Sequence, residues 1–91
     1  MNPNKIAISS LAMDLKRVAL GYWQGSDQTA KRFSEEALKR KDELSGQEVK
    51  PYINVFLEKL PEILNQKDKK KLAEDALTYS VILQNYAVKT L

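Results

Sequence analysis

Apolar residues recur every three or four positions through four successive segments of the chain, and short turns separate these segments. This spacing places the apolar side chains on one face of an α-helix, and no segment shows the strict alternation of a β-strand. The first segment begins at Asn2 and Pro3 and stops at Gly25, because a glycine readily ends a helix. The pattern therefore predicts an all-α fold.

The next two segments carry similar start and stop signals. Ser26 or Asp27 is the expected cap of the second segment, and Gly46 ends it. The third segment is expected to start between Glu48 and Pro51, because proline is tolerated in the first turn of a helix. These signals predict helices of ordinary length joined by turns of a few residues.

A proline lies inside the third segment, whose apolar stripe continues straight through Pro61. Proline removes a backbone hydrogen bond and clashes with the preceding turn, so we expect this helix to be kinked or broken near Pro61. The last segment has Asp68 as its expected cap and carries its stripe to the chain end.

Four amphipathic helices with short connections pack most simply as an antiparallel up-down four-helix bundle, because short turns force consecutive helices to lie antiparallel. We expect one helical-bundle domain over residues 1–91, in which the first and last helices are neighbours. A three-helix fold with a broken third element and a helical hairpin that completes its bundle by dimerising are the alternatives. The expected core includes Leu11, Leu15, Phe33, Phe56, Leu60, Leu72 and Leu83.

The composition excludes several kinds of chemistry, because the chain has neither cysteine nor histidine. Disulfides, thiolate nucleophiles, the usual zinc ligands and the side chain that titrates near neutral pH are all missing. Neighbouring carboxylates such as Glu35 and Glu36 point about 100° apart on a helix, so they do not form a shared proton site. We therefore expect a protein that is not an enzyme and that uses no metal and no cofactor.

The N-terminal region does not resemble a targeting segment. Its apolar stretch is interrupted by Ser9 and Ser10 and has no cleavage site of small residues. No apolar run is long enough to span a bilayer. The expectation is a cytoplasmic protein without a membrane span.

The first and last helices carry more apolar residues than one core needs. Ile6, Met13 and Leu20 are seven positions apart and project opposite the main stripe of the first helix. A second row on the last helix consists of Tyr79, Ile82 and Tyr86. If the two helices are adjacent, the rows form an exposed apolar patch, and such patches mark interaction surfaces. We hypothesise a twofold homodimer through this patch, or a protein partner in a regulatory or adaptor role; the alternative is ordinary scattered surface residues.

The sequence GYWQG places the single tryptophan at the end of the first helix. Trp23 and Tyr22 together can close the end of the bundle as a lid, with their polar atoms reaching partners. Trp23 can instead anchor a partner, since tryptophan is common at interface hot spots. We favour the lid and keep Trp23 as a candidate interface residue.

A lysine cluster surrounds the start of the last helix and comprises Lys67, Lys69, Lys70 and Lys71. Positive charge is disfavoured there by the helix dipole, which raises the alternative of binding to nucleic acid or another anionic surface. The formal net charge of only +3 and the lack of interleaved aromatic residues disfavour nucleic acid as a partner.

Overall fold

The computed structural model describes residues 3–44 and 49–90, and these two ranges contain four α-helices and no β-strand. The helices are α1 (Pro3–Trp23), α2 (Asp27–Leu44), α3 (Pro51–Leu64) and α4 (Lys69–Lys89). The all-α prediction is confirmed. The expected features at Asn2, Gly46 and Glu48 lie outside the described residues.

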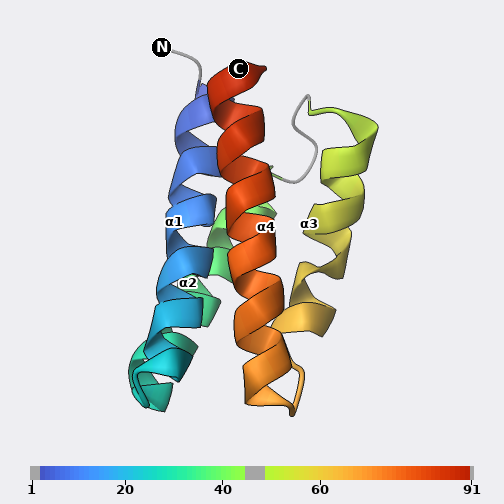
Figure 1. The fold of residues 1–91 in the computed structure, drawn as a ribbon. Coiled ribbons are helices and arrows are strands. Elements are labelled where there is room, and N and C mark those ends of the chain that lie inside the picture. Colours follow the sequence, from blue (N-terminus) through green and yellow to red (C-terminus); the bar gives the residue numbers. More distant parts are fainter. Residues whose placement is uncertain (1–2, 45–48, 91) are drawn as a thin grey trace.

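The helices form the antiparallel up-down bundle that the short connections predicted. Helix α1 packs against α2 and α4, and α3 packs against the same two helices from the other side. The start of α1 and the end of α4 lie at the same end of the bundle (Figure 1). The three-helix arrangement and the isolated hairpin are therefore not observed.

Gly25 ends α1 in the way that its sequence position predicted. Its φ angle is +75°, a conformation that residues with a Cβ rarely adopt. The N–H of Gly25 donates to the Tyr22 carbonyl (3.2 Å) and the N–H of Ser26 donates to the Gly21 carbonyl (2.7 Å), which is the Schellman pattern. The chain then turns directly into α2, where the Ser26 carbonyl accepts the first helical hydrogen bond from Ala30.

The starts of α3 and α4 also follow the predicted signals. Pro51 is the first residue of α3, and Lys50 precedes it in an extended conformation. The carboxylate of Asp68 caps α4 by accepting a hydrogen bond of 3.2 Å from the N–H of Lys71. Helix α3 continues through Pro61 to its last residue, so it is not broken there.

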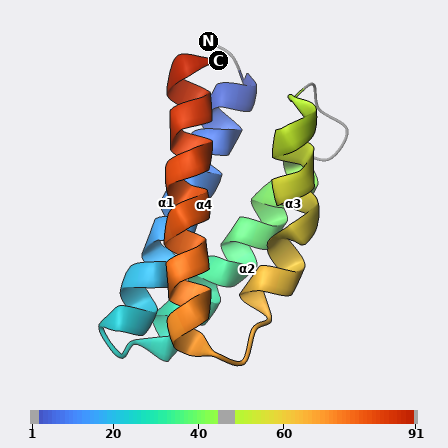
Figure 2. The same cartoon turned by 45° about the vertical axis from the view of Figure 1, so that its right-hand side comes forward.

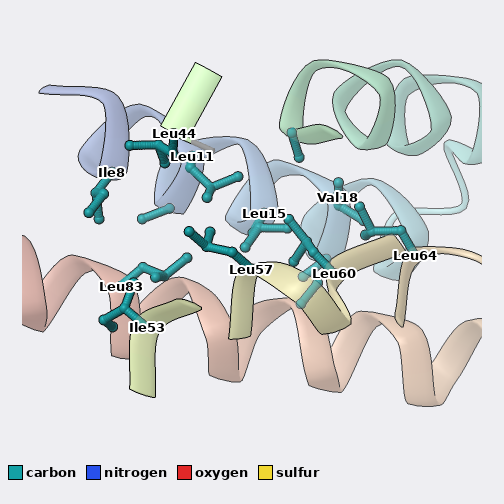
Figure 3. Close-up of a cluster of buried hydrophobic side chains, with 14 of the residues drawn as sticks. Ile8, Leu11, Leu15, Val18, Leu44, Ile53, Leu57, Leu60, Leu64 and Leu83 are labelled. Carbon is teal, nitrogen blue, oxygen red and sulfur yellow. The ribbon is translucent and has the colours of Figure 1, made fainter. Parts of the chain in front are cut away.

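The core lies between the four helices and is built from aliphatic side chains. In Figure 3, Leu15 of α1 gathers with Leu57 and Leu60 of α3 in the middle of this cluster. Five of the seven predicted core residues are fully buried, whereas Phe33 and Phe56 are partly buried at its edge. The five are Leu11, Leu15, Leu60, Leu72 and Leu83.

Side-chain size differs between the two halves of the bundle. The buried residues of α4 include four small ones, Ala73, Ala76, Ser80 and Ala87, and α4 approaches α1 closely along its length. The hydroxyl of Ser80 donates to the carbonyl of Ala12 in α1 across 2.7 Å. Aromatic rings instead separate α3 from α4, and α3 stands visibly apart from α4 over much of its length (Figure 2).

Candidate interaction surface

The predicted row on α1 is exposed. Ile6 and Met13 are each 51% exposed and Leu20 is 39% exposed, although their neighbours Leu11 and Leu15 are fully buried. The seven-residue spacing keeps the three side chains on one side of the helix. This part of the expected patch is therefore on the surface of the subunit.

The predicted row on α4 faces a different neighbour. Tyr86 is only 4% exposed; its ring meets Tyr52 edge-on at 5.9 Å, and its hydroxyl accepts a hydrogen bond of 3.1 Å from the N–H of Lys50. Tyr79 packs edge-on against Phe56 with ring centroids 4.8 Å apart. Both tyrosines cover the contact with α3, so the second row does not meet the row on α1.

The third member of that row, Ile82, is only partly buried. It is not among the large apolar side chains that stand out into solvent. The periodicity placed this row beside the main stripe of α4 but gave no information about which neighbouring helix it would face. In a four-helix bundle α4 has two neighbours, and α3 takes this side.

Two valines supply the exposed apolar surface of α4, although the spacing of Val88 predicted that it belongs to the buried stripe of this helix. Val81 is 51% exposed and Val88 is 61% exposed, and they are seven positions apart, like the residues of the α1 row. The seven-residue spacing that these valines share with the α1 row was the sequence feature that could have identified them. We use the name α1/α4 face for the surface made by Ile6, Met13 and Leu20 of α1 with Val81 and Val88 of α4.

A shallow groove of about 510 Å³ runs between the two helices on this face, with Met13 and Val81 in its lining. Helices α1 and α4 are antiparallel and pack along each other; they lie side by side in Figure 1, and α4 passes in front of α1 in Figure 2. The Ser80 hydroxyl bonds to the Ala12 carbonyl, so the adjacent residues Met13 and Val81 lie at about the same level. Seven residues back along α1 and seven forward along α4 then bring Ile6 to about the level of Val88. The apolar residues of the α1/α4 face thus form two facing rows with a groove between them.

The α1/α4 face is poor in charge. Residues 76–88 of α4 contain no charged residue, and neither do residues 6–13 of α1, although 30% of the chain is charged. Among the residues that line the groove, Lys16 alone is charged, and Ser9, Gln84 and Asn85 are polar. Depletion of charge distinguishes the centre of a protein interface from ordinary surface.

Trp23 lies in the last turn of α1, three residues after Leu20, and it is 50% exposed. Its neighbour Tyr22 is partly buried against the core, and the ammonium of Lys69 lies 5.1 Å from the centre of the Tyr22 ring. Tyr22 therefore closes this end of the bundle, whereas half of the Trp23 side chain faces solvent.

The four lysines around the start of α4 are all exposed. Asp68 lies within this cluster, and its carboxylate already accepts from the backbone N–H of Lys71. Lys69 is directed to the Tyr22 ring. A carboxylate in the middle of the cluster opposes the binding of an anion at this helix start.

A partly buried ion pair joins α1 to α2 and was not expected. Arg40 Nε lies 3.2 Å from Oδ2 of Asp14, whose side chain is 8% exposed. The sequence predicted no role for Asp14. Burial raises the pKa of Asp14 above its ordinary value of 3.8, and the Arg40 guanidinium opposes that rise.

A second perturbed group, Tyr79, lies where α4 meets α3. Burial and the nearby carboxylates of Asp75 and Glu62 raise the pKa of its phenol above the ordinary value of 10.0.

Within residues 3–44 and 49–90 no three acidic side chains come together as a potential metal-binding group. Over the same ranges, no helix combines the length with the apolar character that crossing a bilayer requires.

Comparison with known proteins adds no assignment. The chain matches no protein-family model, no curated protein and no solved structure.

Proposed function

We propose that this protein is a non-enzymatic interaction module that associates with a second copy of itself through the α1/α4 face. The observation that carries the proposal is the coincidence of exposed apolar residues with a segment free of charge. Val81 and Val88 project from thirteen consecutive uncharged residues of α4, beside Ile6 and Met13 of α1. An apolar, charge-poor face of this kind is what the buried centre of an interface requires.

Other exposed apolar residues do not form such a face. Tyr52 and Val55 on α3 are 50% and 48% exposed, but Lys50, Asn54, Glu58 and Lys59 surround them in the sequence. Single apolar side chains among charges are ordinary on protein surfaces. The arrangement in two rows on neighbouring helices is what favours the α1/α4 face.

A second copy is the favoured occupant because the α1/α4 face can cover an identical face. Its two rows share the same seven-residue period, so each can pack against the other row of a partner subunit. The bundle measures 36 Å along its longest axis and 19 to 21 Å across. One long side of a bundle of this size is comparable in area to the ~800 Å² that each partner buries in a standard interface.

Regulatory or adaptor activity in the cytoplasm fits a small dimeric module of this type and is part of the proposal. No observation at the lysine cluster around Asp68 favours an anion-binding function. A dedicated binder of nucleic acid also has a stronger positive footprint than a formal charge of +3.

Size-exclusion chromatography coupled to light scattering tests the proposal. The wild-type chain is expected to have twice the subunit mass of 10.4 kDa at micromolar concentration. Val81→Glu is expected to weaken the dimer by several hundredfold, because each of two symmetry-related sites would bury a carboxylate at a cost of about 2 kcal/mol, or about 4 kcal/mol in all. Circular dichroism checks that the variant is folded.

Val55→Glu is the matched control, because it makes the same substitution at a valine of almost equal exposure on α3. It is expected to leave the dimer unchanged. A wild-type protein that is monomeric at high micromolar concentration would overturn the proposal, and so would equal effects of the two substitutions.

A further inference from the structure

We infer that the twofold axis of the dimer runs parallel to the helices, so that α1 of each subunit packs on α4 of its partner. This inference rests on the proposed function and specifies how the two identical faces meet. A twofold axis within the interface has two simple orientations for a face made of two antiparallel helices. A parallel axis stacks α1 on the partner's α4, and a perpendicular axis stacks each helix on its own copy.

The parallel axis preserves the register that exists within the subunit. Met13 and Val81 line the same groove, so a partner related by this axis places its Val81 over Met13 and its Val88 over Ile6. The uncharged half of one face then covers the uncharged half of the other. The exposed apolar residues of that half, Ile6, Met13, Val81 and Val88, then each meet an apolar residue of the partner.

Charge at the other half of the face also favours this arrangement. Leu20 lies seven residues beyond Met13, and Glu74 lies seven residues before Val81, so the two are level within the subunit. Lys16 lies one turn from Leu20 and lines the groove. The parallel axis brings the ammonium of each Lys16 toward the carboxylate of Glu74 in the partner, with the lysine stem over Leu20.

The perpendicular axis gives a poorer match. If it passes through the level of Met13 and Val81, it places Glu74 against Val88 of the partner and leaves Lys16 opposite the uncharged half of α1. Two carboxylates would then lose water without gaining a partner. If the axis shifts toward the uncharged half, only about half of the face is covered.

Site-specific cross-linking distinguishes the two orientations, and the chain is suited to it because it contains no cysteine. Met13→Cys and Val81→Cys are made as separate variants, one of them with an affinity tag. They are mixed and treated with a bis-maleimide that spans about 8 Å, close to the 8–10 Å spacing of packed helices. The parallel axis predicts efficient cross-linking of the mixture into a tagged heterodimer and little cross-linking of either variant alone.

Each outcome decides the matter. Efficient cross-linking of Met13→Cys alone and of Val81→Cys alone, in a protein that light scattering finds to be dimeric, overturns the parallel axis but leaves the proposed function standing. A monomer in light scattering overturns both. Val55→Cys mixed with Met13→Cys is the control, and cross-linking of that mixture as efficiently as the Met13→Cys and Val81→Cys mixture would overturn the parallel axis.

A charge test gives a second readout. Lys16→Glu is expected to weaken the dimer at least tenfold at low salt, and Glu74→Lys in the same chain is expected to restore most of the loss. Failure of the double variant to recover while both single variants remain folded would contradict the pairing of Lys16 with Glu74. Lys31→Glu, at an exposed site on α2, serves as the control for the change in net charge.

Discussion

Arg40 of α2 donates from its Nε to the carboxylate of Asp14 of α1 across 3.2 Å, and the carboxylate is almost completely buried. The pair links the two helices on the side of α1 away from α4. The sequence placed Arg40 four residues after Glu36, a spacing typical of a surface pair on one helix. In the structure the arginine reaches the neighbouring helix, and Lys39 lies 3.9 Å from Glu36.

The raised pKa of Asp14 predicts how stability depends on pH. The folded protein holds this proton more tightly than the unfolded chain does, so acidification from neutral pH protonates the folded state first. The contribution of Asp14 to stability therefore rises as the pH falls toward its ordinary pKa of 3.8 and is constant below it. Urea denaturation of Asp14→Asn should show the wild type gaining stability relative to the variant between neutral pH and that value.

Asp42→Asn is the control for this experiment, because it removes a carboxylate that is 78% exposed on the same helix as Arg40. An unchanged or falling difference between wild type and Asp14→Asn on acidification would contradict the argument from burial.

The stability difference between the wild type and a variant without Arg40 should shrink on acidification, whereas the difference from Asp14→Asn should grow. Arg40→Met keeps an unbranched apolar stem but leaves the Asp14 carboxylate buried without its donor. We expect a loss of about 1 to 2 kcal/mol in the free energy of unfolding at neutral pH, since the guanidinium is itself partly exposed. The loss should shrink as Asp14 is protonated. A loss independent of pH would mean that packing of the stem, and not the ion pair, is responsible.

The close approach of α1 and α2 predicts the effect of adding one methyl group at Gly21. A Cβ there would lie 3.0 Å from both the Cβ and the backbone nitrogen of Ala30. The helices would have to separate, so Gly21→Ala should destabilise the protein by about 1 to 3 kcal/mol even though alanine favours a helix by about 1 kcal/mol. Thermal or urea denaturation measures the change.

Gly25 provides the contrast, because a Cβ there would meet nothing within 4 Å but the backbone has a positive φ. Gly25→Ala should cost about 1 kcal/mol through the backbone alone, and Gly25→Asn should cost less. If Gly21→Ala is as stable as the wild type, α1 and α2 are not as closely packed as described.

The exposure of Trp23 predicts its fluorescence. Half of this side chain faces solvent, so its emission should be red-shifted and readily quenched by acrylamide. The measurement is best made in Val81→Glu, where association does not cover the end of α1. Blue-shifted emission that resists quenching in this variant would restore the interpretation of Trp23 as part of the lid.

The periodicity of the sequence and its local signals were sufficient for the bundle and for the helix ends at Gly25, Pro51 and Asp68. The caps at Gly25 and Asp68 depend on local backbone chemistry, which a few residues determine. The α1 row could be predicted for the same reason, because residues seven apart share a side of any helix. The position of the Tyr79 and Tyr86 row could not, since it depends on how α4 is rotated between α1 and α3.

The remaining features depend on which residues of different helices come into contact, and the sequence pattern does not give those contacts. Asp14 and Arg40 are 26 positions apart and on different helices. A charged residue next to a buried stripe can face either solvent or a neighbouring helix. The sequence alone does not distinguish these two environments. Val88 shares the three- and four-residue spacing of the buried residues of α4, so periodicity placed it on the buried stripe although it is 61% exposed, and Val81 was assigned to neither row.

Small side chains pack α4 closely against α1, whereas aromatic rings separate α3 from α4. This contrast predicts the order in which the helices unfold. Helix α3 is the shortest helix and has the fewest close neighbours, so its backbone amides should exchange with deuterium through local opening. Amides of α1 and α4 should exchange only when the whole subunit unfolds. A transient loss of α3 would then leave the pair of helices that carries the α1/α4 face intact, and two subunits could remain associated while each is partly open.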